Sequence, residues 1–179
     1  EVKNIKKISS KEVSRLEPLI HCKEALLVPS SGIIDSISFM RSLIGKIEDN
    51  GAMISYNSKI KKIDIKKNLF HTYVTGKENI TIRSKYLINS AGLFASEISN
   101  LIEGLQSKFI PKTYYARGNY FRVSKNLGIN HLIYPIPEGF GLGIHLTLEL
   151  DKSIKFGPDV EWTDNPNDYN VNLERKKIF

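Results

Sequence analysis

A run of small residues, Asn89 to Gly92, is the strongest sign of chemistry in this sequence. It follows an apolar segment, Tyr86 to Ile88, and precedes a helical segment opened by Ser96. A strand that meets small residues and then a helix leaves backbone N–H groups free to bind an anionic or electron-rich ligand. The run therefore indicates one edge of a nucleotide site, although a tight strand-to-helix connection would use the same residues.

The glycine-rich loop that usually accompanies such an edge does not occur in this sequence. That loop follows an earlier strand with the spacing G-x-G-x-x-G, and none of the 12 glycines falls into this spacing. The residues thus predict one part of a nucleotide site rather than a whole one.

His145 is a candidate general base. It lies in the segment GLGIHLTLEL, with glycines before it and Thr147 after it. A neutral imidazole near pH 7 removes a proton from a hydroxyl group or orients it. A histidine in the core or at a sheet edge, with one satisfied hydrogen bond, fits the same pattern, so both interpretations stay open on the residues alone.

Arg117 and Tyr120 form a second candidate group, in the segment YYARGNYFRV with Tyr114 and Tyr115. A guanidinium binds a carboxylate through two parallel hydrogen bonds, and the tyrosines would shape an apolar pocket around it. Alternating aromatic and basic residues are also typical of an exposed sheet edge. The segment therefore indicates either a carboxylate site or an ordinary edge.

Other reaction classes find little support in the residues. His21, His71 and His131 have no partners at the spacing of metal ligands, so no metal site is expected. Cys22 is the single cysteine, which excludes an internal disulfide and a cysteine-based zinc site. No G-x-S-x-G motif occurs, and nucleophilic catalysis is unsupported.

Composition indicates a water-soluble globular protein of one domain or parts of two, with 179 residues of which 41% are hydrophobic. No apolar run is long enough for a membrane span or a signal peptide, so a reduced cytoplasmic setting is expected. The net charge of +7 comes from scattered lysines, which favours a solvated surface over nucleic-acid binding. A basic protein also attracts a small acidic substrate.

The first half of the chain predicts an α/β arrangement. Ser9 and Glu12 have the capping-box spacing for a short helix that ends before Pro18. Asp35 is placed to cap a second helix that ends at Gly51. The apolar residues of this helix recur at helical spacing and predict one buried face: Ile37, Met40, Ile44 and Ile47.

Strand patterns follow from residue 52 onward. Segments 52–56 and 86–89 adjoin helices and are expected in a parallel layer, while segments 59–65, 69–75 and 80–84 are expected to form antiparallel hairpins. Short strands separated by Gly, Pro, Asn and Asp turns predict a mainly antiparallel sheet in the second half: 118–123, 131–136, 141–150 and 153–157. Residues 171–179 are expected to begin a helix.

Five segments, in this order, resemble the L-2-hydroxyglutarate dehydrogenase/oxidase family of the FAD-dependent oxidoreductase superfamily, which includes D-amino-acid oxidase. They are VPSSGIIDS, NSAGLFASEIS, YARGNYFRV, LIYPIP and GIHLTLELDKSIKFGPDVEW. The resemblance implies a mixed α/β fold, with an incomplete FAD-binding Rossmann-like domain at 34–104. It places parts of a mainly antiparallel substrate domain at 1–33 and 105–179.

The resemblance also implies a reaction, in which L-2-hydroxyglutarate loses its hydroxyl proton and passes its C2 hydride to FAD, giving 2-oxoglutarate. FAD-contacting positions match Ile60, Ala91 and Gly92. His145 and Thr147 match a strand that faces flavin and substrate, with His145 as the catalytic candidate. Arg117 and Tyr120 would help to bind the dicarboxylate, and electrons would pass to a quinone at a membrane surface, with the protein peripheral to the inner membrane.

Two glycine-rich segments of the family, one at the start of the FAD domain and one that closes over the flavin, have no match in this sequence. Without the first, FAD affinity is expected to be low, because that segment contacts the pyrophosphate. The sequence is therefore expected to be an internal fragment that is inactive alone. Two alternatives are a non-catalytic dicarboxylate-binding remnant and a subunit that completes its flavin site with a separate chain carrying G-x-G-x-x-G.

Overall fold

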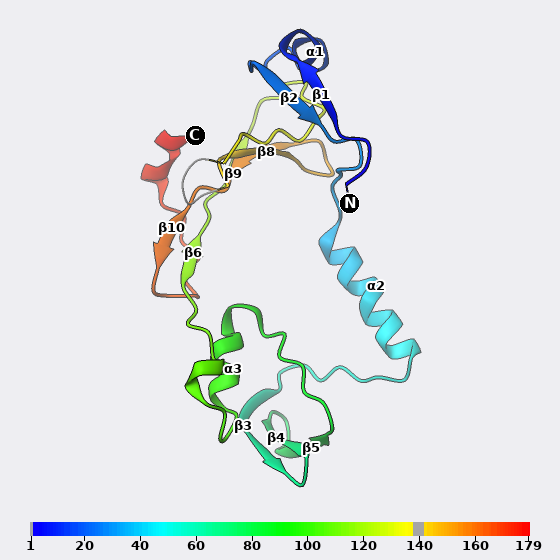
Figure 1. Cartoon of the computed structure of the whole chain (residues 1–179), viewed down its shortest axis with the longest axis vertical. Coiled ribbons are helices and arrows are strands. Elements are labelled where there is room, and N and C mark those ends of the chain that lie inside the picture. Colours follow the sequence, from blue (N-terminus) through cyan, green and yellow to red (C-terminus); the bar gives the residue numbers. More distant parts are fainter. Residues whose placement is uncertain (1, 138–141) are drawn as a thin grey trace. The chain divides into compact units, whose positions relative to one another are not determined.

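The computed structural model describes residues 2–137 and 142–179, so the first residue of the expected strand 141–150 lies outside the described residues (Figure 1). The chain forms two compact units. Unit 1 comprises 1–41, 116–161 and 169–179, and unit 2 comprises 42–115 and 162–168. These boundaries differ from the expected segments 1–33, 34–104 and 105–179, whose assignment to substrate and FAD binding stays a prediction.

The N-terminal part of unit 1 is a short antiparallel pair, β1 (Lys6–Ser9) and β2 (Glu24–Leu27), joined through α1 (Ser10–Leu16). The expected capping box is confirmed, because Ser9 N donates to Glu12 Oε2 at 2.8 Å and Glu12 N donates to Ser9 Oγ at 3.4 Å. The helix ends two residues before Pro18, as the sequence predicts.

Helix α2 (Ser36–Asp49) begins and ends where the sequence predicts. Asp35 Oδ1 accepts hydrogen bonds from Ile37 N at 3.1 Å and Ser38 N at 3.0 Å, and Gly51 follows the helix with a φ of 75°. The expected buried face is wrong, since no residue of α2 is buried and Met40 remains 62% exposed. An apolar helix face is buried only where another element packs against it, and no described element covers this one.

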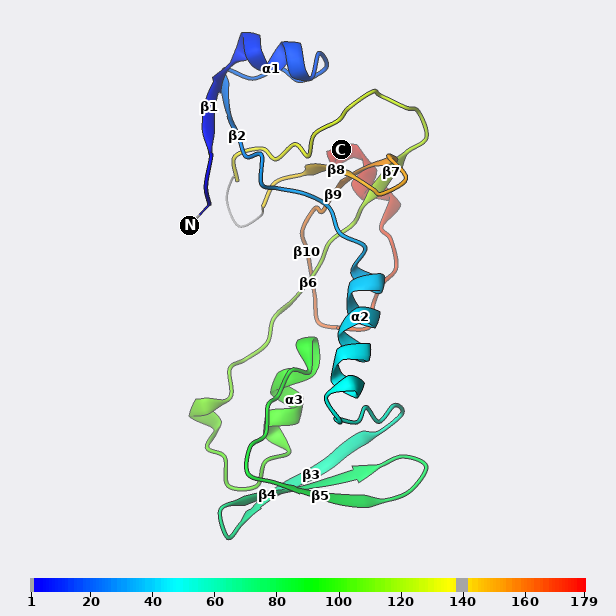
Figure 2. The same cartoon turned by 90° about the vertical axis from the view of Figure 1, so that its right-hand side faces the viewer.

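Unit 2 is built on an antiparallel sheet in the order β3 (Lys59–Lys66), β4 (Leu69–Thr75) and β5 (Ile80–Ser84), which confirms the expected hairpins (Figure 2). Ile63 is fully buried at its centre. Ile63 N donates to Leu101 O at 2.9 Å, just after α3 (Ala95–Asn100), and thereby ties the sheet to this helix.

The two segments expected in a parallel layer, 52–56 and 86–89, form no strands. Met53 is 95% exposed and Ile88 is 85% exposed. A strand is stabilised by hydrogen bonds to a neighbouring strand, and no described residue supplies such a neighbour to either segment. Both segments therefore have the apolar pattern of a strand but belong to no sheet of the described residues.

The central sheet of unit 1 has the order β7 (Phe121–Val123), β9 (Ile154–Gly157) and β8 (His145–Leu148), all antiparallel, as expected for the second half. One face carries the core, in which Ile129, Leu146 and Ile154 are buried together. The expected strand 131–136 contributes only a single bridge, Ile133 to Leu146.

The remaining elements are short. β6 (Tyr115–Arg117) and β10 (Glu161–Thr163) form a two-stranded sheet. Three segments are 3₁₀ helices, η1 (Gly92–Phe94), η2 (Ser107–Phe109) and η3 (Leu173–Ile178), so the helix expected at the end of the chain is 3₁₀ rather than α. None of the described helices is both long and apolar enough to cross a membrane.

Candidate functional site

The sheet of unit 1 carries polar side chains on the face opposite its core. Residues directly opposite each other in adjacent strands share a face. Thr147 of β8 pairs with Lys155 of β9, which in turn pairs with Arg122 of β7. His145 lies two residues before Thr147 and therefore shares this face. Alternation along short strands thus places four polar side chains on one surface, which we call the polar face: Arg122, His145, Thr147 and Lys155.

Tyr120 lies close to the backbone of Gly157, at a distance that a side chain on residue 157 would prevent. A Cβ added at Gly157 would lie 2.6 Å from Asn119 O and 2.6 Å from the Cδ1 atom of Tyr120, and the φ of Gly157 is +140°. Only glycine permits this backbone conformation and this close approach. Lys155 Nζ lies 5.2 Å from the centre of the Tyr120 ring, which is cation–π distance.

One ring nitrogen of His145 is hydrogen-bonded, and the other has no hydrogen-bond partner among the residues that the structure describes. Its Nε2 lies 3.0 Å from the carbonyl oxygen of Leu142, so a neutral imidazole carries its proton on Nε2 and donates it there. Nδ1 is then the acceptor nitrogen. The ring of Tyr134 packs against the imidazole with centres 4.4 Å apart. This arrangement fixes the tautomer and leaves Nδ1 as the basic atom.

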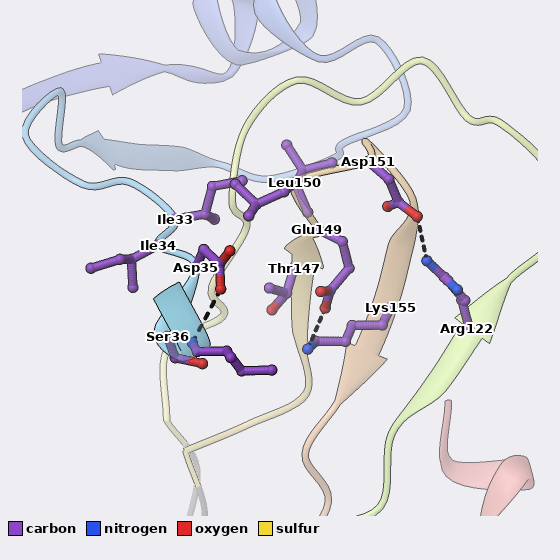
Figure 3. Close-up of a pocket in the computed structure, with 12 residues that line it drawn as sticks. Ile33, Ile34, Asp35, Ser36, Arg122, Thr147, Glu149, Leu150, Asp151 and Lys155 are labelled. Carbon is purple, nitrogen blue, oxygen red and sulfur yellow. Dashed lines mark hydrogen bonds and ion pairs between the residues drawn. The ribbon is translucent and has the colours of Figure 1, made fainter. Parts of the chain in front are cut away.

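A cavity of about 470 Å³ opens beside the polar face, between the β8 and β9 strands and the segment that leads into α2 (Figure 3). Four of its charged side chains form two ion pairs: Arg122 Nη2 lies 2.7 Å from Asp151 Oδ2, and Lys155 Nζ contacts Glu149. Hydrogen bonds from Ser153, together with Arg122, lower the pKa of Asp151. Thr147 lines the same cavity.

Arg117 lies outside this cavity, on β6. Its Nη2 lies 2.8 Å from Glu161 Oε2, and this pairing is the main cause of a lowered pKa at Glu161. The structure therefore places His145 and Thr147 on the polar face and Tyr120 beside it. Arg117 belongs to the separate sheet of β6 and β10. The substrate-binding role of Arg117 stays a prediction.

A second cavity, of about 290 Å³, lies in unit 2 and is lined by Ile60 and Ala91 together. Asn89 shapes the turn beside it: its Nδ2 donates to Ala95 O at 2.7 Å, and its Oδ1 accepts from Ala91 N at 3.2 Å. Gly92, with a φ of +56°, begins η1 immediately after this turn and does not line the cavity. The structure thus joins two of the three expected FAD-contacting positions.

The model of the FAD dependent oxidoreductase family (DAO) matches residues 2–178 of this sequence. The chain belongs to this family. FAD is the family's cofactor, and the mixed α/β fold with antiparallel sheets agrees with it.

Several curated relatives are L-2-hydroxyglutarate dehydrogenases. The mitochondrial protein of Arabidopsis thaliana is 34% identical, over 99% of this chain and 45% of its own length. The protein of Escherichia coli K12 is 31% identical, over 85% of this chain and 36% of its own length. A glycerol 3-phosphate dehydrogenase of Caloramator mitchellensis is 29% identical, over 86% of this chain and 32% of its own length. The chain therefore spans less than half the length of these relatives.

Two solved structures share the fold. The L-alpha-glycerophosphate oxidase of Mycoplasma pneumoniae, with FAD bound, aligns with a TM-score of 0.77 at 20% identity, covering 98% of this chain and 44% of that one. The L-proline dehydrogenase of P. horikoshii aligns with a TM-score of 0.78 at 20% identity, covering 97% of this chain and 45% of that one.

The cavity in unit 2 fits one part of FAD rather than the whole cofactor. Its walls include the apolar side chains Ile60, Leu87, Ile88 and Ile98, which suit a flat aromatic ring system. Its volume lies at the lower end of the range of ligand pockets, roughly 300 to 1,000 Å³. Among the described residues, no group of three or more His, Cys, Asp or Glu side chains is placed to hold a metal ion.

Sequence reasoning missed Lys155 and Arg122 as members of the candidate site. Neither residue was assigned a role, because alternation within a strand does not reveal which residue of the next strand lies opposite. The register of β7, β9 and β8 places them beside Thr147. A signal was nevertheless present: IKFG alternates apolar and other residues with a period of two, which assigns Lys155 to the face opposite Ile154 and Phe156.

Proposed function

We propose that this chain forms part of an oxidoreductase that converts L-2-hydroxyglutarate, or a related 2-hydroxy acid, to the 2-oxo acid with hydride transfer to FAD. The observation that carries this proposal is the similarity of nearly the whole chain to L-2-hydroxyglutarate dehydrogenases. The polar face of unit 1 supports it, because Arg122, Thr147 and Lys155 of this face line a cavity. His145 does not line the cavity but lies two residues before Thr147 on the same face.

Residues of the polar face, its neighbour Tyr120 and the residues near the cavity of unit 2 would have separate roles. Nδ1 of His145 would accept the proton of the substrate hydroxyl, since its Nε2 is engaged by Leu142. The hydroxyls of Thr147 and Tyr120 would orient the substrate. Ile60, Ala91 and Gly92 would contact FAD, which supplies the hydride acceptor when bound.

Electrons would leave the flavin for a further acceptor, and we propose a quinone at a membrane surface that the protein meets peripherally from the cytoplasm. The net charge of +7 would favour approach to an anionic surface. We also propose that the flavin site is completed by a polypeptide with the glycine-rich loop, because the cavity in unit 2 fits only part of FAD.

Glycerol 3-phosphate is the main competing substrate, because one curated relative is a glycerol 3-phosphate dehydrogenase. It shares a hydroxyl group and a negative charge with 2-hydroxyglutarate but offers a phosphate in place of carboxylates. The experiment must therefore separate these two anions.

The test follows the blue absorbance of flavin under anaerobic conditions, in two samples. The first holds the purified chain with excess FAD, and the second holds a chimera in which this chain replaces the matching region of the E. coli relative. The proposal predicts bleaching of the chimera's flavin by L-2-hydroxyglutarate and little bleaching by the D-isomer, glycerol 3-phosphate or L-proline. A chimera that retains flavin but is bleached only by glycerol 3-phosphate, or by none of them, would contradict it.

A further inference from the structure

Lys155 of the polar face is placed so that its ammonium group could contact a ligand in the cavity of unit 1. Lys155 lines the cavity of unit 1 and pairs across the strands with Thr147. Its ammonium group also approaches the ring of Tyr120 at 5.2 Å. It therefore stands among the same side chains that would orient a hydroxy acid.

We infer that Lys155 binds a carboxylate of the ligand in this cavity and selects dicarboxylates, and that Glu149 competes with the ligand for the ammonium group. This inference rests on the proposed function for the identity of the ligand as a 2-hydroxy dicarboxylate. Arg117, the arginine that the sequence indicated, lies on β6, is paired with Glu161 of β10 and does not line the cavity.

The pair of Lys155 and Glu149 is suited to such exchange. The two side chains are 35% and 38% exposed, so water screens their attraction and the ion pair is weak enough for another carboxylate to replace it. Figure 3 shows Lys155 reaching across to Glu149 beside Thr147. An incoming carboxylate would find the ammonium group already oriented at the cavity wall.

Arg122 lines the same cavity, and its ion pair with Asp151 is more exposed, at 61% and 63%, but its guanidinium is held by more hydrogen bonds than the ammonium group of Lys155. Its Nη2 donates to Asp151 Oδ2 at 2.7 Å, and its Nε donates to Ser153 Oγ at 3.0 Å. These bonds hold the guanidinium with two partners from the turn after β8. Among the described residues each cation has one ionic partner, but Arg122 is also hydrogen-bonded to Ser153, whereas Lys155 lies directly opposite Thr147.

The charge balance of the cavity explains why one lysine is enough to select dicarboxylates. Three carboxylates line the cavity, Asp35, Glu149 and Asp151, against the two cations Lys155 and Arg122. A second negative charge on the ligand would therefore be repelled unless a cation receives it. Displacing Glu149 makes Lys155 available to that carboxylate, and the displaced Glu149, already 38% exposed, would then be solvated by water.

The test measures the dissociation constants of glutarate, L-2-hydroxyglutarate and butyrate for the full chain, by NMR titration of methyl signals from Ile33, Ile34 and Leu150, which line the cavity. Lys155→Gln is expected to weaken binding of both dicarboxylates by about five- to tenfold and to leave butyrate within about twofold. Glu149→Gln is expected to tighten both dicarboxylates by about threefold or more, because it removes the competitor.

Glu174 and Lys177 provide the matched control, because they form an exposed ion pair of the same type at 2.9 Å in unit 1 and do not line the cavity. Glu174→Gln changes the net charge as Glu149→Gln does, and Lys177→Gln changes it as Lys155→Gln does. Both controls are expected to leave all three dissociation constants unchanged. A merely structural role for the Lys155–Glu149 pair would make Lys155→Gln and Glu149→Gln weaken binding alike, whereas our inference requires opposite signs.

The inference is overturned if the wild-type chain shows no preference for dicarboxylates, or if Lys155→Gln binds them as tightly as the wild type. Its failure is separable from that of the proposed function. Opposite effects of the two variants on glutarate, without flavin bleaching by L-2-hydroxyglutarate, would retain the dicarboxylate site and remove the reaction. Flavin bleaching by L-2-hydroxyglutarate, with no effect of Lys155→Gln on binding, would retain the reaction and remove the dicarboxylate site.

Discussion

Asp159 accepts two hydrogen bonds from Asn119 with the same oxygen, Oδ1, one from the backbone N–H at 2.7 Å and one from the side-chain amide at 2.9 Å. Its other oxygen, Oδ2, accepts from Arg175 Nε. Both Asp159 and Asn119 are buried. Because Tyr120 follows Asn119 directly, this carboxylate fixes the segment that carries a residue of the candidate site.

Asp159→Ala is expected to lower the free energy of unfolding by about 1 to 3 kcal/mol, because it leaves the buried donors of Asn119 and the half-buried Nε of Arg175 without this acceptor. Urea denaturation followed by circular dichroism measures the change. Asp164→Ala, at an exposed position, is the control and is expected to have almost no effect. Equal stability of the two variants would show that Asp159 does not hold this segment.

Acid should destabilise the protein through Asp64 and Asp159. Contacts with Lys62 first, and also with Lys66 and Tyr73, lower the pKa of Asp64. Burial opposes ionisation of Asp159, but hydrogen bonds from Arg175 and Asn119 outweigh it and lower its pKa. A folded-state pKa below the unfolded value, about 3.9 for aspartate, stabilises the protein above that pH.

This stability is lost as the pH falls from about 4 toward the folded-state pKa values. The free energy of unfolding should therefore decrease between about pH 5 and pH 3, and Asp64→Asn should flatten part of the decrease. Denaturation curves at several pH values test both statements. An unchanged slope in Asp64→Asn would remove Asp64 from this account.

Gly157→Ala is expected to destabilise unit 1, because the added Cβ meets Asn119 O and the Tyr120 ring at 2.6 Å. We expect a loss of about 2 to 4 kcal/mol from steric overlap together with backbone strain. Two further substitutions separate these causes in thermal unfolding. Gly128→Ala has a positive φ of +67° but open space, and Gly32→Ala has neither constraint, so the expected order of damage is Gly157, Gly128, Gly32.

Substitutions on the apolar face of α2 should change association rather than folding. Met40 and Ile47 are 62% and 40% exposed, so Met40→Gln with Ile47→Gln should leave the free energy of unfolding within about 0.5 kcal/mol of the wild type per site. Sedimentation velocity should show less self-association, because the exposed apolar patch is smaller. Ile63→Ala, at a fully buried site, is the contrasting variant, with an expected loss of about 2 to 4 kcal/mol. A large loss of stability in the double variant would mean that this face is packed.

Local features were predictable from the sequence because their causes lie within a few residues. The capping box of Ser9 and Glu12 and the Asp35 cap depend on spacings of two or three residues, and the hairpins of β3, β4 and β5 depend on alternation and turns. The pairing of Ile60 with Ala91 in one cavity followed from the family resemblance rather than from either residue.

Features that depend on distant partners were not predictable in the same way. Segments 52–56 and 86–89 have strand patterns, but a strand needs a neighbour, and α2 has an apolar face without a described element to bury it. Lys155 and Arg122 join Thr147 only through the register of three strands. Arg117 has the chemistry of a carboxylate ligand, yet it is paired with Glu161.

His145→Gln tests the central claim, that the polar face of unit 1 supplies the base for the oxidation of a 2-hydroxy acid by FAD. The glutamine amide still donates a hydrogen bond to the carbonyl of Leu142 but has no basic Nδ1. Loss of a general base slows proton removal by about 100-fold or more. Flavin content is measured in both proteins, so that their rates are compared at equal flavin content.

The most direct measurement is the rate of flavin bleaching by L-2-hydroxyglutarate in the chimera, with His145 and with His145→Gln, at equal flavin content. We predict bleaching that L-2-hydroxyglutarate causes and glycerol 3-phosphate does not, and a rate lowered by about 100-fold or more in His145→Gln. Equal rates with and without the histidine, or no bleaching of bound flavin by L-2-hydroxyglutarate, would contradict the account.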